Sequence, residues 1–402
     1  MKILFVHEVS WYNKVVFEMH DFPELLSLRG HEVRFLDFDE GRPRAKWRSL
    51  VRTESRAHTG SAVQVTTGPR ILPGIAGRLL ATILQPIMFL RLVNEAKPDV
   101  VVTYSIPTSG WQITALCNQL GIPIVARVID VSHVLRKTFF ERLVKRAEAF
   151  VYRNADHVST HNSALLQYCR ELGAKELKSS VICPGVDLVR FSSGRPNATL
   201  QGQLGLDAED KVVLFMGTLF RFSGLFELLT DLIPALKSDT KLKFLILGDG
   251  EDFCRLQSLV QDSKAEQQVL FAGRIDYVNL PEFLRLGCVA VLPFKQELVT
   301  HAALPAKVLQ YLACGLPTVS IELKGLQSIV GPDDGVAFVP SIERMSSEIV
   351  SLLSDSQRMS LLSERARGFV QANCDWSTQI HLFEQVLESV QCKDGQQGMT
   401  TI

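Results

Sequence analysis

The sequence predicts an α/β protein with two doubly wound parallel sheets, one in each half of the chain. A length of 402 residues exceeds what one hydrophobic core usually supports, so two domains of about 200 residues are expected. Short apolar segments typical of buried strands alternate with helical segments in both halves. A stretch rich in serine, glycine and proline at residues 192–197 separates the halves and has the composition of a linker.

The expected strands fall into two sets, each interrupted by helical segments as a doubly wound sheet requires. The first set is Ile3–His7, Glu32–Asp37, Asp99–Thr103, Pro123–Val128, His157–Thr160 and Ser180–Cys183. The second set is Lys211–Met216, Leu242–Leu247, Val269–Ala272, Cys288–Pro293, Pro317–Ile321 and Val336–Val339. From Ser341 onward the pattern is helical, and we expect a last helix at Trp376–Val390 followed by a disordered polar tail.

The composition is that of an ordinary soluble protein, but its two halves differ in charge. Hydrophobic residues make up 46% of the chain and charged residues 21%, and the formal net charge is zero. Residues 1–185 carry a net charge of +7 and the remainder −7. The two halves are therefore expected to bind different partners.

The cysteines and the apolar stretches predict a cytoplasmic protein. Eight cysteines are scattered, mostly inside apolar segments, without Cys-x-x-Cys pairs or the Cys/His spacing of a zinc site. The apolar run at residues 1–6 is too short for a signal peptide. The longest apolar region, Ile71–Val93, is broken by two prolines and two arginines, whereas a membrane span needs about 20 apolar residues, so none is expected.

One basic segment, Gly41–His58, departs from the alternating pattern. It contains only one acidic residue, and Trp47 stands among its cations. The cations are Arg42, Arg44, Lys46, Arg48, Arg52 and Arg56. Followed by the apolar and basic stretch Arg70–Arg91, such a segment suits an anionic membrane surface, at about 1 kcal/mol per cation, and Arg42–Arg56 is the expected contact. A solvated loop whose arginines pair locally is the alternative. A segment that binds nucleic acid would have a similar sequence, but nucleic acid is not the expected partner.

The segment Leu304–Val319 contains the strongest local signal for an anion site. Proline at the start and glycine after the end delimit a helix at Pro305–Cys314. The helix follows a buried strand, so its N-terminus is expected in the crevice where parallel α/β sheets bind phosphates. Lys307 in the first turn opposes the helix dipole by roughly 0.3–1 kcal/mol, which is reasonable if an anion binds there. Lys307 and Gln310 share a face, and a solvated pair is the alternative.

Two glycine-bearing turns follow strands in the second half, at Gly217–Gly224 and Gly248–Gly250. Glycine lets the backbone approach a phosphate closely, and Ser223 is expected to cap a helix at Leu225–Leu236. Neither turn is a dinucleotide fingerprint, because Phe253 stands where the third glycine would be. Hydride transfer is therefore poorly supported, and the motifs of P-loop enzymes, serine hydrolases and zinc proteases are absent from the sequence.

A series of short motifs, each modest alone, stands in an order and spacing that is specific as a whole. The motifs are Ala155–Val158, Leu172–Gly173, Val181–Asp187, Phe215–Leu219, Leu247–Gly250, Val269–Gly273, Val291–Phe294 and Leu312–Val319. The series resembles the retaining GT-B glycosyltransferases of the large nucleotide-sugar-dependent type called glycosyl transferases group 1. The resemblance covers roughly residues 95–385.

The resemblance implies the GT-B architecture of two Rossmann-like domains with a C-terminal crossover helix. The N-terminal acceptor domain is expected at residues 1–184, the nucleotide-sugar domain at 185–370, and a helix returning to the first domain, with a flexible tail, at 371–402. The implied substrates are a nucleoside-diphosphate sugar and a glycan or lipid-linked acceptor, with retention at the anomeric carbon and no protein nucleophile. No metal or other cofactor is expected, because helix N-termini and cations can neutralise the leaving diphosphate.

Position by position, the resemblance also implies a donor site. Gly217 and Thr218 fall in the diphosphate-binding turn, and Arg274 and Ile275 fall beside the nucleotide base. Gln310 falls where the family usually has a glutamate on the ribose hydroxyls, and its amide oxygen can accept the same bond without charge assistance. The expected donor-binding residues are Gly217, Thr218, Ser223, Gly248, Arg274, Ile275, Leu304 and Gln310.

The chain departs from the family pattern at its charged positions. Thr218 and Ser223 stand where the family usually has an arginine and a lysine. Arg221 and Lys307 are expected to replace these cations, since the leaving diphosphate needs neutralising charge as the glycosidic bond breaks. Ala302 stands where an acid usually precedes the ribose-binding position by eight residues.

In the first domain, Asp130 and His133 follow the expected strand Pro123–Val128, where the family often places a histidine or aspartate facing the sugar. Either side chain could bind the transferred sugar or orient the acceptor hydroxyl. The alternative is that Asp130 caps the next helix and His133 is a surface residue. The family's N-terminal Gly-Gly loop is replaced by Glu8–Lys14, and His7 before it is expected to be structural.

The resemblance therefore implies a hexosyltransferase of cell-envelope polysaccharide or glycolipid synthesis, which we expect to be cytoplasmic or peripheral on the inner face of the membrane. A non-catalytic GT-B protein that partners another glycosyltransferase is one alternative, favoured by the missing acid and cations. A nucleotide-sugar epimerase, which releases free product without an acceptor, is the other. Nucleotide-sugar binding with turnover distinguishes an enzyme from the non-catalytic protein.

Overall fold

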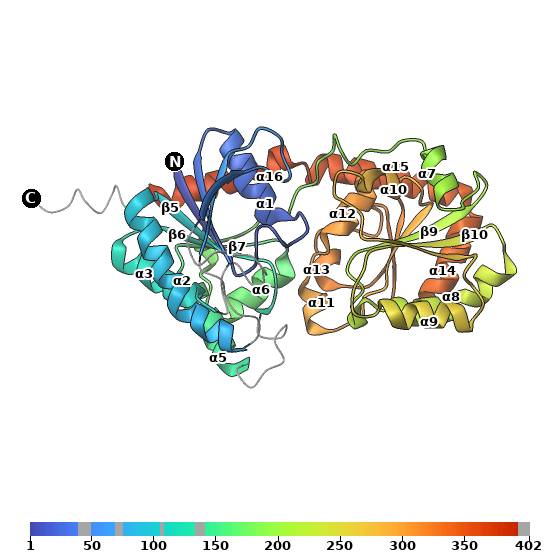
Figure 1. Ribbon diagram of the computed structural model, residues 1–402, viewed down its shortest axis with the longest axis horizontal. Coiled ribbons are helices and arrows are strands. Elements are labelled where there is room, and N and C mark those ends of the chain that lie inside the picture. Colours follow the sequence, from blue (N-terminus) through green and yellow to red (C-terminus); the bar gives the residue numbers. More distant parts are fainter. Residues whose placement is uncertain (39–49, 69–74, 105–107, 133–140, 393–402) are drawn as a thin grey trace, which may run out of the picture. The chain divides into compact units, whose positions relative to one another are not determined.

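The computed structural model describes residues 1–38, 50–68, 75–104, 108–132 and 141–392, which form two compact units (Figure 1). The first unit comprises Met1–Cys183 together with the chain from Ser377 onward, and the second is Pro184–Trp376. The sequence predicted domain boundaries after residues 184 and 370. Each unit contains one sheet covered by helices on both faces (Figure 1).

The first unit has an eight-stranded sheet in the order β3-β4-β2-β1-β5-β6-β7-β8. All neighbouring strands are parallel except β3, which is antiparallel to β4. In register, Val6 pairs with Leu36 on one side and Thr103 on the other, so these strands end together. The strands are β1 (Lys2–Val6), β2 (Glu32–Asp37), β3 (Leu50–Glu54), β4 (Val63–Thr67), β5 (Val100–Thr103), β6 (Ile124–Val128), β7 (His157–Thr160) and β8 (Ser179–Val181).

Two of these strands, β3 and β4, were not predicted, and β3 lies inside the basic segment expected at the membrane surface. Arg52 is exposed on β3. Arg56, in contrast, donates from its guanidinium to the carbonyl oxygens of Trp11 and Lys14, so its side chain belongs to the folded domain. Four cations of the segment lie outside the described residues, namely Arg42, Arg44, Lys46 and Arg48.

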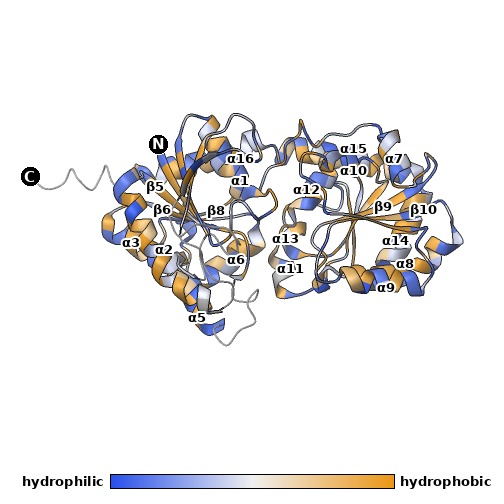
Figure 2. Ribbon diagram, viewed as in Figure 1, coloured by the Kyte–Doolittle hydropathy of each residue, from blue (hydrophilic) through white to orange (hydrophobic). Residues whose placement is uncertain are grey.

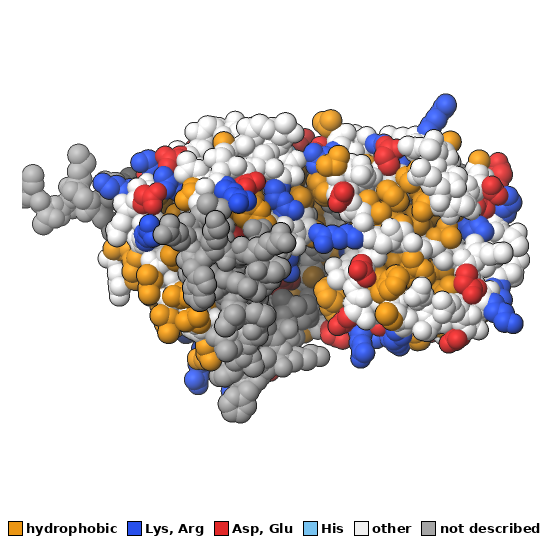
Figure 3. All heavy atoms as spheres, viewed as in Figure 1, with side chains coloured by type: hydrophobic (Ala, Val, Ile, Leu, Met, Phe, Trp, Pro, Cys, Tyr) orange, Lys and Arg blue, Asp and Glu red, His pale blue; other side chains and the backbone are white. Residues whose placement is uncertain are grey.

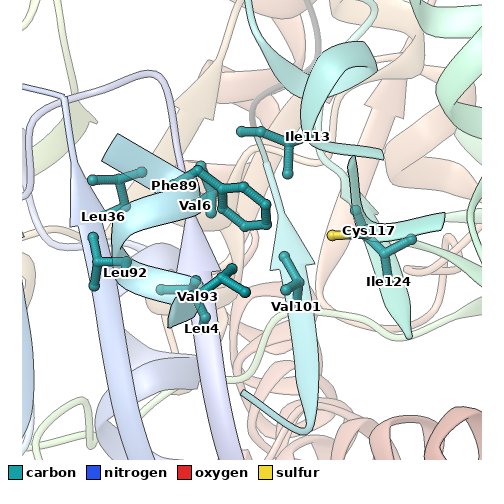
Figure 4. Packing of buried hydrophobic residues seen from close by; sticks show 10 residues of the cluster. All are labelled: Leu4, Val6, Leu36, Phe89, Leu92, Val93, Val101, Ile113, Cys117 and Ile124. Atoms are coloured by element: carbon teal, nitrogen blue, oxygen red, sulfur yellow. The ribbon is translucent and has the colours of Figure 1, made fainter. Parts of the chain in front are cut away.

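Helices cover both faces of this first sheet, and Figure 1 shows α2, α3 and α5 on one face and α1 and α16 on the other. The helices are α1 (Glu18–Leu28), α2 (Ile75–Ala96), α3 (Gly110–Leu120), α5 (Glu141–Asn154), α6 (Ser163–Glu171), η1 (Glu176–Lys178) and α16 (Trp376–Gln391). Between α2, α3 and the strands lies a core of buried residues: Leu4, Val6, Leu36, Phe89, Leu92, Val93, Val101, Ile113, Cys117 and Ile124 (Figure 4).

Helix α16 returns to the first unit, as the resemblance implied. Phe383 packs against Phe22 of α1 with ring centroids 4.5 Å apart. Glu384 accepts hydrogen bonds of 2.6 Å from Arg29 Nη2 and from His31 Nε2. Partial burial favours a higher pKa for the Glu384 carboxyl, but Arg29 and His31 hold that pKa below its ordinary value. The C-terminal helix is thus fixed by an apolar contact to α1 and by charged contacts to the residues that follow α1.

The second unit has a six-stranded, all-parallel sheet in the order β11-β10-β9-β12-β13-β14. The strands are β9 (Lys211–Met216), β10 (Leu242–Leu247), β11 (Val269–Gly273), β12 (Val289–Leu292), β13 (Thr318–Ile321) and β14 (Val336–Val339). The strand order reverses between β9 and β12. In open α/β sheets, ligands bind at such a reversal, in the crevice outside the carboxyl ends of the strands.

The helices around this second sheet are mostly two-faced, apolar toward the strands and polar toward solvent (Figure 2). They are α7 (Ala198–Gln203), η2 (Arg221–Ser223), α8 (Leu225–Ser238), α9 (Phe253–Asp262), α10 (Leu280–Leu284), α11 (Leu298–Ala302), α12 (Ala306–Ala313), α13 (Lys324–Gln327), α14 (Ile342–Ser354) and α15 (Ser356–Asn373). Helix α8 follows β9, and α12 lies between β12 and β13. Both helices therefore begin near the reversal of strand order.

Candidate active site

Three turns at the carboxyl ends of β9, β10 and β11 are hydrogen-bonded to one another. Gly217 donates from its backbone N–H to the Leu247 carbonyl oxygen at 2.8 Å, and Gly248 donates to the Gly273 carbonyl oxygen at 2.7 Å. These turns hold most of the residues expected around the donor: Gly217, Thr218, Gly248, Arg274 and Ile275. The backbone is therefore fixed where those residues are expected to meet a ligand.

Glycine is required at two of these positions. Gly217 has a φ of +138° and Gly248 a φ of +148°, which L side chains rarely adopt. A Cβ atom on Gly248 would also collide with the carbonyl oxygen of Gly217. The two turns can approach this closely only because neither residue carries a side chain.

The substitution Gly248→Ala is expected to destabilise the second unit by about 1–3 kcal/mol, because it combines backbone strain with this collision. The matched control is Gly202→Ala in α7, where nothing lies within 4 Å of the added methyl group. Alanine in that helix should stabilise the protein by about 0.5–1 kcal/mol. Urea denaturation of both variants checks this, and equal effects would contradict the packing of the turns.

Lys307 brings a cation to this glycine turn from the first turn of α12. Its Nζ lies 4.7 Å from the ring centroid of Phe215 and 4.9 Å from that of Phe294, and a Cβ atom on Gly217 would collide with it. No hydrogen bond or ion pair of Lys307 occurs within the described part of the chain. Burial lowers the pKa of the Lys307 ammonium to about 7. An anion beside it would reverse that effect.

Helix α12 is anchored to the end of β9 by a buried tyrosine. Met216 donates from its backbone N–H to the hydroxyl oxygen of Tyr311 at 2.8 Å. This bond fixes the position of α12 along the end of β9, and with it the positions of Lys307 and Gln310 relative to the glycine turn. Gln310 is half-buried on α12, and its amide makes no hydrogen bond to another described residue. Its oxygen and N–H groups are thus available to a ligand.

The start of α8 differs from the prediction, because Ser223 does not cap the helix. Gly224 is the N-cap, in the left-handed conformation with a φ of +67°, and a Cβ atom there would collide with the Pro293 carbonyl oxygen. Ser223 instead ends the short turn η2 and donates its backbone N–H to the Phe220 carbonyl oxygen. Its hydroxyl is buried and has no hydrogen-bond partner within the described residues. That hydroxyl and the free N–H groups of α8 can serve a bound anion.

The remaining expected residues lie around these turns with different exposures. Thr218, Arg221 and Arg274 are exposed, Ile275 is half-buried and Leu304 is buried. The side chains of Arg221 and Arg274 make no hydrogen bond or ion pair to another described residue. The structure thus brings Gly217, Gly248 and Lys307 into contact and leaves the two arginines at the surface.

In the first unit, the expected residue Asp130 follows β6 and is partly buried. Burial, together with the nearby Glu18 carboxylate, raises the pKa of Asp130 to about 7. A carboxyl group that titrates near neutrality can exchange protons with a reacting hydroxyl. His133 lies outside the described residues.

His7, expected from the sequence to be structural, comes directly after β1 and is buried. Its ring stacks on Tyr104 with centroids 4.8 Å apart, and its Nδ1 accepts the backbone N–H of Glu8 at 2.8 Å. Burial, and then the nearby His20 and Lys14, lower the pKa of His7 to about 3. The imidazole is therefore neutral at physiological pH and supplies no positive charge.

A buried ion pair near Asp130 was missed by the sequence interpretation. Arg127 on β6 donates from Nε and Nη2 to the two carboxylate oxygens of Glu18, each at 2.8 Å. Arg127 also donates to the Ser159 hydroxyl and the Thr160 carbonyl oxygen. An arginine inside an otherwise apolar strand was the available signal, because a buried cation needs an internal anion.

These features define a class: two Rossmann-like domains whose second sheet presents glycine turns, a helix N-terminus and a half-buried cation at the switch in strand order. That is the architecture of a GT-B glycosyltransferase. Residues 20–190 match the family model Glycosyltransferase Family 4, and residues 197–369 match Glycosyl transferases group 1. The two matches together cover most of the chain and make it a GT-B glycosyltransferase, with the group 1 match confined to the second unit.

Relatives and solved structures agree with this assignment. The chain is 22% identical over 276 residues to the N-acetyl-alpha-D-glucosaminyl L-malate synthase of Bacillus anthracis, covering 67% of this chain and 68% of that protein. Across three curated relatives, the matched parts span 57% to 68% of the relatives' lengths.

Solved structures extend the likeness over nearly the whole chain. The sucrose-phosphate synthase of Thermosynechococcus elongatus superposes with a TM-score of 0.78 at 19% identity, covering 97% of this chain and 99% of the other. HepE of Anabaena, solved in complex with UDP, superposes with a TM-score of 0.73 at 16% identity, covering 97% and 100%. At these identities the likeness establishes the GT-B fold.

Proposed function

We propose that this protein transfers a hexose from a nucleoside-diphosphate sugar to a glycan or lipid-linked acceptor, with retention at the anomeric carbon. The observation that carries the proposal is Lys307, a half-buried cation without an anionic partner in the described structure, held against the glycine turn at Gly217. A diphosphate beside the Nζ would supply the missing charge.

The surrounding residues have definite roles in this proposal. Lys307 binds the diphosphate and neutralises the negative charge that develops on it as the glycosidic bond breaks. Ser223 and the N-terminus of α8 donate to the phosphate oxygens, and Arg221 adds a second cation from the exposed turn η2. The backbone at Gly217 and Thr218 lies along the diphosphate, and no metal ion or other cofactor is required.

The nucleoside is proposed to lie between the turn after β11 and helix α12. Arg274 and Ile275 contact the base, Gly248 allows the close approach of the turns, and Gln310 binds the ribose hydroxyls, with Leu304 at the edge of the site. In the first unit, Asp130 and His133 are proposed to meet the sugar or the acceptor hydroxyl. HepE of Anabaena was solved with UDP, which makes uridine nucleotides the first donors to test.

A thermal-shift titration with UDP, GDP, ADP and their sugars tests the proposal. A ligand at 100 times its dissociation constant stabilises a protein by about 2.7 kcal/mol, or roughly 5–10 °C for a unit of this size. We expect such a shift with one nucleotide series. Incubation with the sugar of that series should then release the nucleotide only when an acceptor is added.

A second candidate is a GT-B protein that binds a partner glycosyltransferase without catalysis. It is favoured by Ala302 and Gln310, which stand where the family usually has acids. The absence of a shift with every nucleotide supports this alternative, and a shift with free sugar release but no acceptor transfer supports an epimerase. The cytoplasmic location, the inner membrane face and the role in cell-envelope polysaccharide or glycolipid synthesis are part of the proposal.

A further inference from the structure

Helix α2 of the first unit presents an apolar face to solvent. Leu79, Leu80, Ile83 and Ile87, called the apolar stripe below, are 58%, 42%, 62% and 57% exposed. The opposite face of α2 packs into the core of the unit (Figure 4). The outer face of a helix on a sheet is usually polar, so the stripe has no explanation in the folding of the unit. Figure 3 shows apolar side chains gathered on this part of the surface.

The length and composition of α2 add to this observation. Residues Gly77–Ala96 have a mean hydropathy of 1.3, enough by length and composition for a membrane-crossing helix. However, the helix is packed against the sheet along one side, through Phe89, Leu92 and Val93. Its apolar character on the other side is therefore suited to lying on a membrane surface rather than crossing one.

The neighbouring helix α3 continues this surface without charge. Gln112 donates from its side chain to the Thr82 carbonyl oxygen of α2 at 2.9 Å, which places the start of α3 against the middle of α2. Trp111 beside it is 41% exposed. Helix α3 contains no charged residue. A tryptophan that is exposed next to an apolar stripe is typical of a protein surface at a membrane interface.

Helix α5, on the other side of α3, supplies positive charge. Asn118 of α3 donates to the Asn154 carbonyl oxygen of α5 at 3.2 Å, so the two helices are adjacent. A groove of about 620 Å³ along α5 is lined by Arg142, Lys145, Arg146 and Arg153. Its described lining includes no aspartate or glutamate. We call this the basic groove.

The cations of the basic groove have no anionic partner in the described part of the chain. Arg142, Lys145 and Arg146 form no ion pair with another described residue. Among the described residues, Arg153 donates only to the Leu172 carbonyl oxygen, at 3.0 Å. Leu143, 61% exposed, lies among these cations on the same helix. Helix α5 thus combines unpaired positive charge with exposed apolar surface.

We propose that the apolar stripe, Trp111 and the basic groove bind the first unit to an anionic bilayer, with lipid phosphate groups in the groove and the stripe in the upper acyl region. An apolar contact and a basic patch together give stable attachment where either one alone is marginal. The surface is distinct from the Arg42–Arg56 segment. Its purpose, access to a lipid-linked acceptor, rests on the proposed function, but binding itself does not.

Co-sedimentation of the full chain with vesicles tests this proposal without any activity measurement. Vesicles of phosphatidylcholine alone are compared with vesicles that also contain phosphatidylglycerol. The wild-type protein should bind the mixed vesicles, and the triple variant Arg142→Gln/Lys145→Gln/Arg146→Gln should lose roughly 100-fold in partition coefficient. The variant Ile83→Ser/Ile87→Ser should lose roughly 20-fold or more, because both side chains leave the acyl region.

Matched controls exclude a general effect of lost charge or lost apolar surface. Lys211→Gln/Lys241→Gln/Lys264→Gln removes three exposed lysines from the second unit, and Val278→Ser removes an apolar side chain that is 71% exposed there. Both should bind like the wild type. Unchanged binding of the folded α2 or α5 variants, or equal binding to both kinds of vesicle, would overturn the proposal.

Two further arms separate lipid binding from related outcomes. Inorganic phosphate at constant ionic strength should leave the vesicle-bound fraction unchanged, whereas release by phosphate alone would identify the groove as a site for a soluble anion. The vesicle variants should keep the nucleotide-induced thermal shift of the wild type. A nucleotide-induced thermal shift without vesicle binding would refute only the proposed membrane surface. Vesicle binding without a thermal shift would refute only the proposed donor site.

Discussion

The substitution Lys307→Met is expected to weaken the binding of the nucleoside diphosphate by roughly 10- to 100-fold, since a hydrogen bond to a charged group contributes about 1.5–3 kcal/mol. The same substitution should stabilise the free protein. In the absence of an anion, the Lys307 ammonium is held against Phe215, Phe294 and Gly217, where burial lowers its pKa to about 7. Methionine fills a similar volume without a charge that must be desolvated.

The stabilisation by Lys307→Met should depend on pH in a defined direction. A lysine has an ordinary pKa near 10.4, so between about pH 7 and 10 the unfolded chain binds one more proton at this position than the folded chain. The penalty of the buried lysine is therefore full below pH 7 and fades as the pH rises toward 10. The variant should gain more stability at pH 6 than at pH 9, which urea denaturation at both values measures.

Donor binding by the wild type should show the linked effect. The free protein must take up a proton to present a cation, so affinity for the nucleoside diphosphate is expected to fall as the pH rises from 7 to 9. Lys307→Met should bind weakly at both values. The control is Lys324→Met in α13, an exposed lysine that should change neither affinity nor its pH dependence. Full affinity in the folded Lys307→Met variant would remove Lys307 from the site.

Much of the fold was predictable because its strands are short apolar runs between helices. The strands β2, β7, β9, β10 and β14 begin and end where the sequence indicated. In contrast, β3 and β4 were missed, because β3 carries exposed polar side chains at the edge of its sheet. Its pairing with β4 is set by backbone hydrogen bonds, which leave little trace in composition.

The site was only partly predictable for a related reason. Lys307 and the glycines could be found because each violates a local preference, the helix dipole in one case and the cost of flexible backbone in the other. The rings of Phe215 and Phe294 around Lys307 could not, since aromatic residues at strand ends are ordinary core residues. The prediction that Ser223 caps α8 was wrong, because Gly224 is the N-cap. Gly224 adopts a left-handed conformation, which lets the chain pass the Pro293 carbonyl.

The substitution Arg127→Met is expected to destabilise the first unit by about 3–5 kcal/mol, because it leaves the carboxylate of Glu18 buried without its cation. Arg127 is fully buried and also contacts the ring of Phe22, with its guanidinium carbon 5.1 Å from the ring centroid. Calorimetry should show an unfolding midpoint lower by roughly 6–20 °C.

The double variant Arg127→Met/Glu18→Gln distinguishes a lost ion pair from lost packing. If the uncompensated charge of Glu18 causes most of the damage, the second substitution removes that charge and should restore more than half of the lost stability. A double variant as unstable as Arg127→Met would instead assign the loss to the contacts of Arg127 with Phe22, Ser159 and Thr160. Because burial and then the Glu18 carboxylate raise the pKa of Asp130, the double variant should lower that pKa, which carboxyl NMR titration measures. The Glu18 carboxylate would then add to the effect of burial on the protonation of Asp130, the candidate catalytic acid.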